Sequence, residues 1–311
     1  MPERRTKIHY AALFLLPLIV AAFGISVAGA VALVLLMLAW RWALSLSFIA
    51  APPRGPELVL ETISASHFVE KVRWCLDRLG VDYVERAAGG TLGAFFLGRT
   101  VPRLWFRAGA SRSMIGNSSE ILRYLWGRDA AERPEAAAFL EATPERIELE
   151  GRIDRCGADL QVWVYFHLLA HRDLTLHAWG ANSPDLPAWQ RAVLKLLYPL
   201  LAFLIRQAFR ISPHRHERAV AHLEQLMSDV EDRLADGRGS ILGGATVNYT
   251  DLAFAAIMGL WLMPAQYGGG RADRVRIAAD DVPDAMRREI DDWKTRYPRV
   301  TQFIESRYAE R

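Results

Sequence analysis

The hydrophobic pattern changes its period several times between residues 58 and 125. Residues 58–63 form an apolar run with β-branched side chains, which is typical of a buried strand. A short polar turn follows, and apolar side chains then recur at helical spacing through residues 69–79. Gly80 comes directly after this pattern, and glycine commonly ends helices. The segment therefore predicts a strand followed by an amphipathic helix.

Three more strands and a second helix are predicted in the rest of this segment. Short apolar runs at residues 81–84, 100–106 and 111–116 have the composition of strands. Pro102 stands at the start of the second run, where its missing N–H costs no ladder hydrogen bond and where cis proline is frequent. A helix over residues 117–125 begins at an asparagine, which is a good N-cap. The order of these elements predicts a compact α/β unit.

Three motifs of this unit follow the order and spacing of the cytosolic-type glutathione transferases. The stretch at residues 66–72 is similar to the Ser-Pro-aromatic-x-x-Lys/Arg-Val sequence that opens the first helix of that family. Val101-Pro102 is similar to the Val-Pro pair of the family, whose proline is cis. Asn117-Ser118 stands where the family has Glu/Gln-Ser before its last thioredoxin-fold helix. The chain therefore resembles this family.

The resemblance covers residues 58–311 and implies two domains. A thioredoxin-like α/β domain over residues 58–127 would bind glutathione, and an all-α helical bundle would follow over residues 134–311. Helical periodicity at 135–149 and 160–169 agrees with such a bundle. Members of the family usually dimerise, so a homodimer is expected.

The resemblance makes Ser66 the candidate catalytic residue. A free thiol titrates near 8.5, so glutathione needs a donor that stabilises its thiolate. A hydroxyl at a helix N-terminus supplies a hydrogen bond and a favourable dipole. The alternative is that Ser66 only caps the helix. The motif also places Phe68 and His67 at the glutathione site, and His67 stands where the family has proline. It would contact the thiolate or a carboxylate of the tripeptide, or else be an exposed turn residue.

Four further residues would bind glutathione if the resemblance holds. Val101, before Pro102, would offer its backbone N–H and C=O to the cysteinyl part of the tripeptide. Ser118 would hold the γ-glutamyl carboxylate, assisted by the N-terminus of its helix. Asn117 replaces the usual acid or amide of the family, and an amide still donates and accepts. The structural roles of Pro102 as a turn residue and of Ser118 as a cap are compatible with binding.

The two cysteines predict neither a disulfide framework nor redox catalysis. Cys75 and Cys156 fall in different predicted domains and belong to no Cys-x-x-Cys pattern. A reducing compartment is therefore expected. In cysteine-type relatives the reactive cysteine would lie at Val69 or, on a shifted alignment, at Ser66. Cys75 lies deeper in the helix and is expected to be packed, which disfavours a reductase.

The remaining sequence predicts helices to the end of the chain. The apolar run at residues 194–205 is too short and interrupted to span a bilayer, so it predicts a buried core helix or an interfacial one. An amphipathic helix follows at 214–234. Asn248 and Asp251 have the spacing of a capping box. Residues 293–311 resemble the closing helix of the family.

Three histidines lie close together in the sequence. His167 and His171 have the i, i+4 spacing that can hold a metal on one helix, with His177 beyond them. No carboxylate or cysteine nearby completes a ligand set. We therefore expect no metal site.

The N-terminal segment, residues 1–51, predicts a membrane anchor. From residue 10 to residue 51 the only ionisable side chain is that of Arg41. Two short spans with a turn at residues 24–29 would fit, and basic residues at both ends would place both ends and the soluble domains in the cytoplasm. One long span that ends near Trp40, followed by an amphipathic segment, fits as well. Residues 52–57 read as a proline-rich linker.

The charge balance excludes one large class of partners. The 311 residues carry 38 Lys and Arg against 35 Asp and Glu, and no basic stripe interleaved with aromatics appears, so nucleic acid is not expected. Together, the features predict a membrane-anchored transferase that conjugates glutathione to hydrophobic electrophiles. The alternative is a non-catalytic binding or scaffold protein of the same fold at the membrane. A transport-associated subunit is a third interpretation, without an intramembrane charge pattern to support it.

Overall fold

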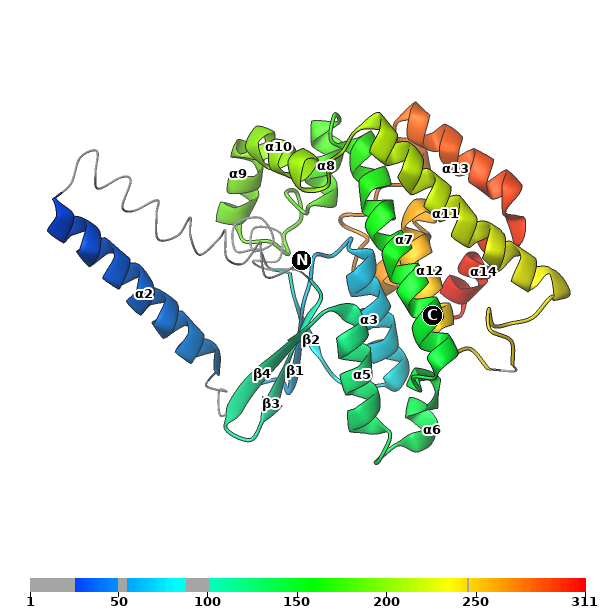
Figure 1. The fold of residues 1–311 in the computed structure, drawn as a ribbon, viewed down its shortest axis with the longest axis horizontal. Helices are drawn as coiled ribbons and strands as arrows, with labels where there is room; N and C mark the ends of the chain where they lie inside the picture. Colours follow the sequence, from blue (N-terminus) through cyan, green and yellow to red (C-terminus); the bar gives the residue numbers. More distant parts are fainter. Residues whose placement is uncertain (1–25, 50–54, 88–100, 245) are drawn as a thin grey trace. The chain divides into compact units, whose positions relative to one another are not determined.

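The computed structural model describes residues 26–49, 55–87, 101–244 and 246–311. The chain divides into two units, one of residues 1–55 with 107–113 and one of residues 56–106 with 114–311 (Figure 1). The first unit contains helix α2, Val27–Ile49. Within the described residues no single helix is long and apolar enough to cross a membrane.

The predicted pair of membrane spans is therefore not found in the described residues. The first of these spans lies outside them. Helix α2 starts at Val27, inside the predicted turn at residues 24–29, and continues without a break for 23 residues. The second unit, which contains both predicted domains apart from residues 107–113, holds the candidate site.

The four strands form one mixed sheet in the order β2-β1-β3-β4. Their bounds are Leu58–Glu61 for β1, Val84–Arg86 for β2, Arg103–Ala108 for β3 and Ser111–Gly116 for β4. Strand β1 runs parallel to β2 and antiparallel to β3, with Val59 opposite Val84 on one side and Trp105 on the other. This topology, with its crossover helix, is the thioredoxin-like arrangement that the sequence predicts.

Strand β2 begins later than predicted because the C-terminal cap of the preceding helix includes residue 81. Helix α3, His67–Leu79, ends at Gly80, which adopts a left-handed conformation with φ 63°. The N–H of Val81 then donates to the carbonyl of Leu76, which closes the last turn. Residue 81 therefore belongs to the helix cap, and the strand starts at Val84.

Helices α3 and α5, Ser118–Asp129, pack together against the sheet (Figure 1). The side chains at this contact are apolar and almost fully buried: Leu58, Leu60, Val72, Leu76, Ile121 and Leu125. Burying such a side chain contributes roughly 1.5–3 kcal/mol. The apolar spacing of the sequence thus encodes this half of the core.

The helical region holds nine α-helices among the described residues. They are α6 Pro134–Ala137, α7 Pro144–Leu168, α8 Arg172–Ala178, α9 Ala188–Leu196, α10 Tyr198–Ala208, α11 Pro213–Arg233, α12 Tyr249–Leu262, α13 Asp284–Arg296 and α14 Pro298–Ala309. Helix α12 is buried along nearly its whole length and packs against α3, α7 and α14. The predicted capping box at its start is confirmed, because the N–H of Asn248 donates to Asp251 at 2.9 Å.

Three helix boundaries differ from the prediction. The separate helices predicted at 135–149 and 160–169 are mostly one helix, α7, which has neighbours on several sides and so shows no single apolar face. The predicted closing helix breaks before Pro298, because proline disfavours a helical conformation in the residue before it. The helix predicted at 194–205 is divided between α9 and α10, with Pro199 in the first turn of α10.

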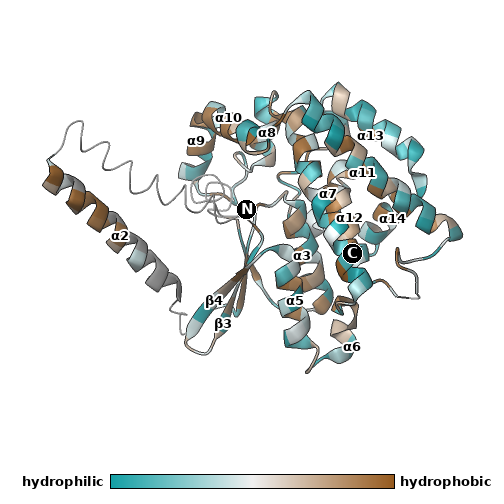
Figure 2. Cartoon of the chain, in the orientation of Figure 1, coloured by the Kyte–Doolittle hydropathy of each residue, from teal (hydrophilic) through white to brown (hydrophobic). Residues whose placement is uncertain are grey.

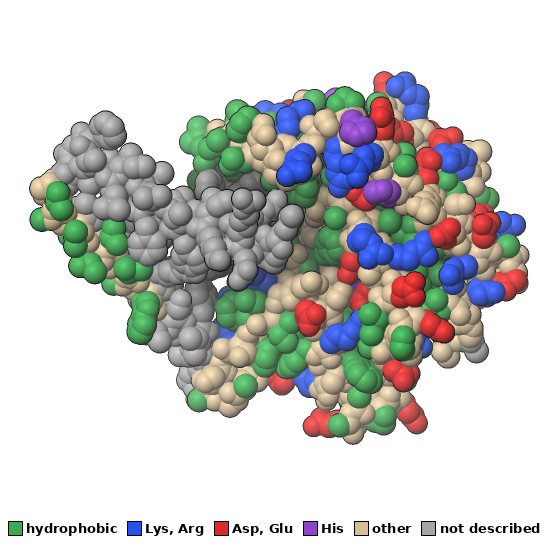
Figure 3. Space-filling view, viewed as in Figure 1, with side chains coloured by type: hydrophobic (Ala, Val, Ile, Leu, Met, Phe, Trp, Pro, Cys, Tyr) green, Lys and Arg blue, Asp and Glu red, His purple; other side chains and the backbone are tan. Residues whose placement is uncertain are grey.

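The bent pair α9 and α10 presents an apolar face to solvent. The two helices meet at an angle of 72°. Their exposed large apolar side chains are Trp189, Leu196, Leu200, Phe203 and Leu204. The pair is among the more hydrophobic helices in Figure 2, and Figure 3 shows hydrophobic side chains gathered over it. Residues 194–205 therefore have one buried face, which contains Leu194, Leu201 and Ile205, and one exposed face, so neither interpretation describes the whole segment.

Helix α7 comes very close to the first turn of α3 at Gly157. A Cβ on Gly157 would lie 2.8 Å from Cζ of Phe68 and 3.3 Å from Nε2 of His67. Real Cβ atoms are almost never found this close to a neighbour. The glycine therefore allows the two domains to pack against each other.

We expect Gly157→Ala to destabilise the protein by about 1–3 kcal/mol, since the added methyl overpacks this contact. Gly151→Ala on the same helix is the matched control, because its Cβ would meet only Nη1 of Arg155 at 3.6 Å. This control is expected to gain up to about 1 kcal/mol from helix propensity. Urea unfolding of both variants measures the difference, and equal stabilities would contradict the tight contact.

Candidate functional site

Ser66 occupies the N-cap position of α3, but its hydroxyl does not cap the helix. Its backbone is extended, with φ −72° and ψ 123°, and no side-chain capping bond is present. The N–H of Glu70 donates to the Ser66 carbonyl at 2.9 Å, so the backbone alone starts the helix. The hydroxyl makes no hydrogen bond to any described residue and is partly exposed. It is therefore able to donate to a ligand at the helix N-terminus.

His67 is buried, so the prediction of an exposed turn residue is wrong. The side chain is 2% exposed, and its Nε2 lies 2.9 Å from the carbonyl oxygen of Gly157. A carbonyl only accepts, so the proton must be on Nε2. Burial lowers the pKa of His67 to about 4, against the raising effect of the Gly157 hydrogen bond, and the ring is neutral at pH 7. The His67 side chain thus joins the first turn of α3 to α7.

Phe68 shares this contact with His67. The two ring centroids lie 4.4 Å apart, and the Phe68 ring lies against Gly157. Both residues were predicted to bind glutathione. Their observed contacts join α3 to α7, and their role toward a ligand stays a prediction.

The predicted cis proline is present. The Val101–Pro102 peptide is cis, Pro102 is buried, and strand β3 begins at the next residue. Val101 itself is partly exposed. Its backbone lies at the start of β3, next to the end of β1.

Asn117 is the N-cap of α5. Its φ of 73° is positive, and its ψ of 130° lies outside the left-handed helical region. Its Oδ1 accepts from the N–H of Ser119 at 3.0 Å. Ser118 is the first residue of the helix and is buried, and its hydroxyl has no hydrogen-bond partner among the described residues. The helix N-terminus at Ser118 can therefore receive an anion.

These predicted residues lie at the same end of the strands of the sheet. Glu61, the last residue of β1, pairs with Arg103, the first residue of β3. The loop to Ser66 and the cis peptide are therefore at the same end of these two strands. The hairpin of β3 and β4 returns the chain to this end of the strands, where Ser118 begins α5. A hydroxyl, a backbone strand end and a helix N-terminus thus meet within one small region. This is the candidate glutathione site.

Lys71 joins α3 to α5 and α7 through a buried ion cluster next to this region. The side chain is fully buried, and its Nζ lies 2.7 Å from Glu150 and 2.8 Å from Asp154 of α7. It also donates to Ser119 Oγ at 3.2 Å, and Ser119 donates to Asp154 at 2.7 Å. Because α3, α5 and α7 all contribute, the ion cluster fixes the start of α5 next to α3.

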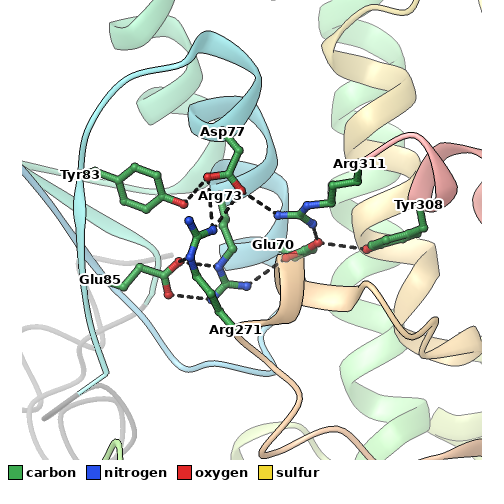
Figure 4. Close-up of polar contacts among 8 residues, drawn as sticks. All are labelled: Glu70, Arg73, Asp77, Tyr83, Glu85, Arg271, Tyr308 and Arg311. Carbon is green, nitrogen blue, oxygen red and sulfur yellow. Dashed lines mark hydrogen bonds and ion pairs between the residues drawn. The ribbon is translucent and has the colours of Figure 1, made fainter.

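Arg73 is also buried and belongs to a second ionic cluster (Figure 4). Its guanidinium binds both carboxylate oxygens of Glu85, at 2.6 and 2.9 Å, and lies 2.9 Å from Glu70. Arg311, at the chain's last position, binds Glu70 and lies 3.1 Å from Asp77. These contacts fasten β2 and the C-terminal residue to α3.

The two cysteines are free and buried, as predicted for Cys75. Burial raises the pKa of Cys75 to about 12 and that of Cys156 to about 11. Neither side chain is a thiolate at neutral pH. Neither cysteine therefore supplies a nucleophile.

A basic cleft lies between α7 and α11 and extends to the end of α10. Its volume is about 890 Å³. Basic side chains predominate in its lining: Arg152, Arg155, Arg210, His214, Arg215, Arg218 and His222. Phe209 and Leu226 supply apolar walls, and Asp159 is the one acid in the lining. The cleft was not predicted, because its residues are scattered along the sequence and meet only when the helices pack.

No protein-family model and no curated protein matches the sequence. Among solved structures, a glutathione S-transferase from Methylobacterium radiotolerans in complex with glutathione sulfonate is 17% identical, with a TM-score of 0.47. The match covers 80% of this chain and 89% of that chain. A glutathione S-transferase from Methylobacillus flagellatus with glutathione bound is 14% identical, with a TM-score of 0.45, over 80% and 93% of the two chains. FzlA from C. crescentus is 14% identical, with a TM-score of 0.42, over 80% and 86%. The function has to be argued from this chain's own residues.

The buried His67 predicts that stability falls as the pH is lowered. In the unfolded chain histidine binds a proton near pH 6.5, but in the folded protein His67 binds one only near pH 4. The unfolded state therefore binds more protons between these values, and about 2 kcal/mol should be lost between pH 7 and pH 5. Urea unfolding at the two pH values measures this loss.

His67→Gln should remove this part of the pH dependence, because an amide does not titrate but can still donate to Gly157. His171→Gln is the control, since His171 is exposed and its replacement should leave the dependence intact. An unchanged pH slope in His67→Gln would show that another group is responsible.

Proposed function

We propose that the protein is a glutathione-dependent transferase. The proposal rests on three features that lie at the same end of the strands. They are the Ser66 hydroxyl, the cis peptide before Pro102, and the N-terminus of α5 at Ser118. Both serine hydroxyls make no hydrogen bond to a described residue. The motif resemblance at the same positions assigns each feature a part of the tripeptide.

The proposed reaction depends on stabilising the thiolate of glutathione. Each unit by which the site lowers the thiol pKa corresponds to about 1.4 kcal/mol. The Ser66 hydroxyl would donate to the sulfur, and the positive end of the α3 dipole would act in the same direction. The thiol proton passes to solvent, the sulfur forms a bond to the electrophilic carbon, and the leaving group departs with its electron pair. Ser118 and the α5 N-terminus would hold the γ-glutamyl carboxylate.

Ser118→Ala and Ser66→Ala separate binding from chemistry. We expect Ser118→Ala to weaken glutathione binding by about 10-fold or more, since a hydrogen bond to a charged group contributes about 1.5–3 kcal/mol. Ser66→Ala should leave binding nearly unchanged and slow conjugation, most strongly at low pH, where the unassisted thiol is protonated. Calorimetry gives the affinity, and a chromogenic electrophile such as a chlorodinitrobenzene gives the rate.

Ser64→Ala in the preceding turn is the matched control, and it should change neither quantity. Absence of glutathione binding in the unmodified protein would overturn the proposal.

A second candidate is a non-catalytic binding or scaffold protein. Two residues of the candidate site favour it, because their side chains already make hydrogen bonds within the protein. The imidazole of His67 bonds to Gly157, and the side chain of Asn117 caps α5. Glutathione binding that depends on Ser118, together with a conjugation rate that does not respond to Ser66→Ala, would support this candidate.

We further propose that the protein acts at a membrane and takes hydrophobic electrophiles that partition there. Two surfaces support this. Helix α2 exposes Val27, Val31, Leu35 and Leu36, and the pair α9 and α10 exposes the apolar face described above. Between residues 186 and 216 the sequence has no acidic residue, while Arg191, Lys195, Arg206, Arg210 and Arg215 are basic. Apolar and basic side chains on one short helical segment fit an anionic lipid surface. A cytoplasmic position of the folded body and a homodimer remain our expectations.

Vesicle flotation tests the membrane proposal with the full chain. Binding should be stronger to vesicles with anionic lipid than to zwitterionic vesicles, and salt should weaken it. Leu196→Glu with Phe203→Glu should reduce binding, because charges replace exposed apolar side chains. Val31→Glu with Leu35→Glu makes the same test of α2.

Lys195→Glu should weaken binding to anionic vesicles more than the matched change Lys294→Glu on α13. The proposal fails if the unmodified chain does not float with either kind of vesicle. Binding that all of these variants leave unchanged would exclude both surfaces.

A further inference from the structure

Two buried histidines and a glutamate from three helices bring their ligand atoms together. His167 lies near the end of α7, His216 in the first turn of α11 and Glu289 on α13. Nε2 of His167 is 3.3 Å from Oε2 of Glu289, and Nε2 of His216 is 3.5 Å from the same oxygen. All three donor atoms lie within 4.8 Å of one another. The cluster is thus compact enough to share one ion.

The two imidazole nitrogens lie near the carboxylate without meeting the geometry of a hydrogen bond. Neither Nε2 has a hydrogen-bond partner, although the side chains are only 4% and 11% exposed. At 3.3 Å from an acceptor, His167 Nε2 lacks a hydrogen bond because of its direction, not its distance. Buried polar atoms without a partner are rare and call for an explanation. A shared ligand explains both nitrogens at once.

The spacing of the donors fits a tetrahedral zinc ion. With Zn–N and Zn–O bonds of about 2.0–2.2 Å, neighbouring donors of a tetrahedral site lie about 3.4 Å apart. The two imidazole-to-carboxylate distances of 3.3 and 3.5 Å lie on either side of this value. Two imidazoles and one carboxylate are also a donor set that zinc accepts.

We infer that His167, His216 and Glu289 form a zinc-binding site, with a fourth position open to water. The Glu289 side chain is 31% exposed, so solvent reaches the cluster from its side. This inference is independent of the glutathione site, since it uses residues of the helical region alone.

The surroundings hold the three ligands in place. The indole Nε1 of Trp163 donates to Oε2 of Glu289 at 2.6 Å, and the ring of Phe166 stacks on His216 at 4.0 Å. Such outer contacts commonly orient metal ligands.

Zinc titration of the full chain tests the inference. The protein is first treated with EDTA and freed of the chelator, and zinc chloride is then added in a calorimeter. We expect one zinc ion per chain. Cobalt(II) gives an independent readout, because a four-coordinate site produces visible absorption bands that six-coordinate aqueous cobalt lacks.

Glu289→Gln is the principal variant, because glutamine keeps the shape of the side chain and can still accept from Trp163. We expect it and His216→Ala each to weaken zinc binding at least about 10-fold, and Trp163→Phe to have a smaller effect. His222→Ala is the matched control, since His222 pairs with Asp159 at 2.8 Å without a third ligand, and it should leave binding unchanged. Circular dichroism verifies that each variant is folded.

The result that overturns the inference is an unmodified chain that binds no zinc. Zinc binding that persists in both Glu289→Gln and His216→Ala would overturn it as well, because the ion would then lie elsewhere. An unaltered affinity in Glu289→Gln alone would reject Glu289 as a ligand.

Discussion

The burial of charged side chains on α3 is the constraint on which the rest of the structure depends. Lys71 and Arg73 have no access to solvent, and Glu70 lies with them. Burying an ionised group costs several kcal/mol unless opposite charges and hydrogen bonds surround it. The partners of Lys71 come from α7, and those of Arg73 come from α3 and β2. The α/β domain is therefore incomplete without the helices, which explains why most of the first predicted domain and all of the second form one unit.

This constraint also determines where the candidate site lies. Ser119, the second residue of α5, is held by Lys71 and Asp154, so the start of α5 cannot shift along the sheet without breaking the ion cluster. At the start of α3, His67 is held by Gly157 of the same helix α7. Buried ion pairs contribute little net stability but make alternative packings costly. In this protein the Lys71 cluster holds the start of α5 and the His67 hydrogen bond holds the start of α3, the two helix N-termini that the proposed glutathione site requires.

The sequence predicted the features that depend on neighbouring residues. The spacing of apolar positions gave α3 and its end at Gly80, Val101-Pro102 indicated the cis peptide, and Asn248 indicated its capping box. It did not predict the partners of Lys71, because the acids belong to another helix. A polar residue inside an apolar helix face has the same local pattern whether it is solvated or paired. His67 was misjudged for the same reason, since the space it fills is created by Gly157, ninety residues later.

The prediction of no metal site also failed to consider residues that are distant in the sequence. His167 was considered with His171 and His177, its neighbours in sequence, but α7 ends at Leu168 and His177 faces the Arg276 carbonyl. Helix packing brings His216 and Glu289 to it instead. The helical region, which carries the basic cleft, the exposed face of α9 and α10 and the histidine cluster, holds the features that distinguish this chain chemically. The chemistry of this region therefore depends on how the helices pack, which the local sequence pattern does not show.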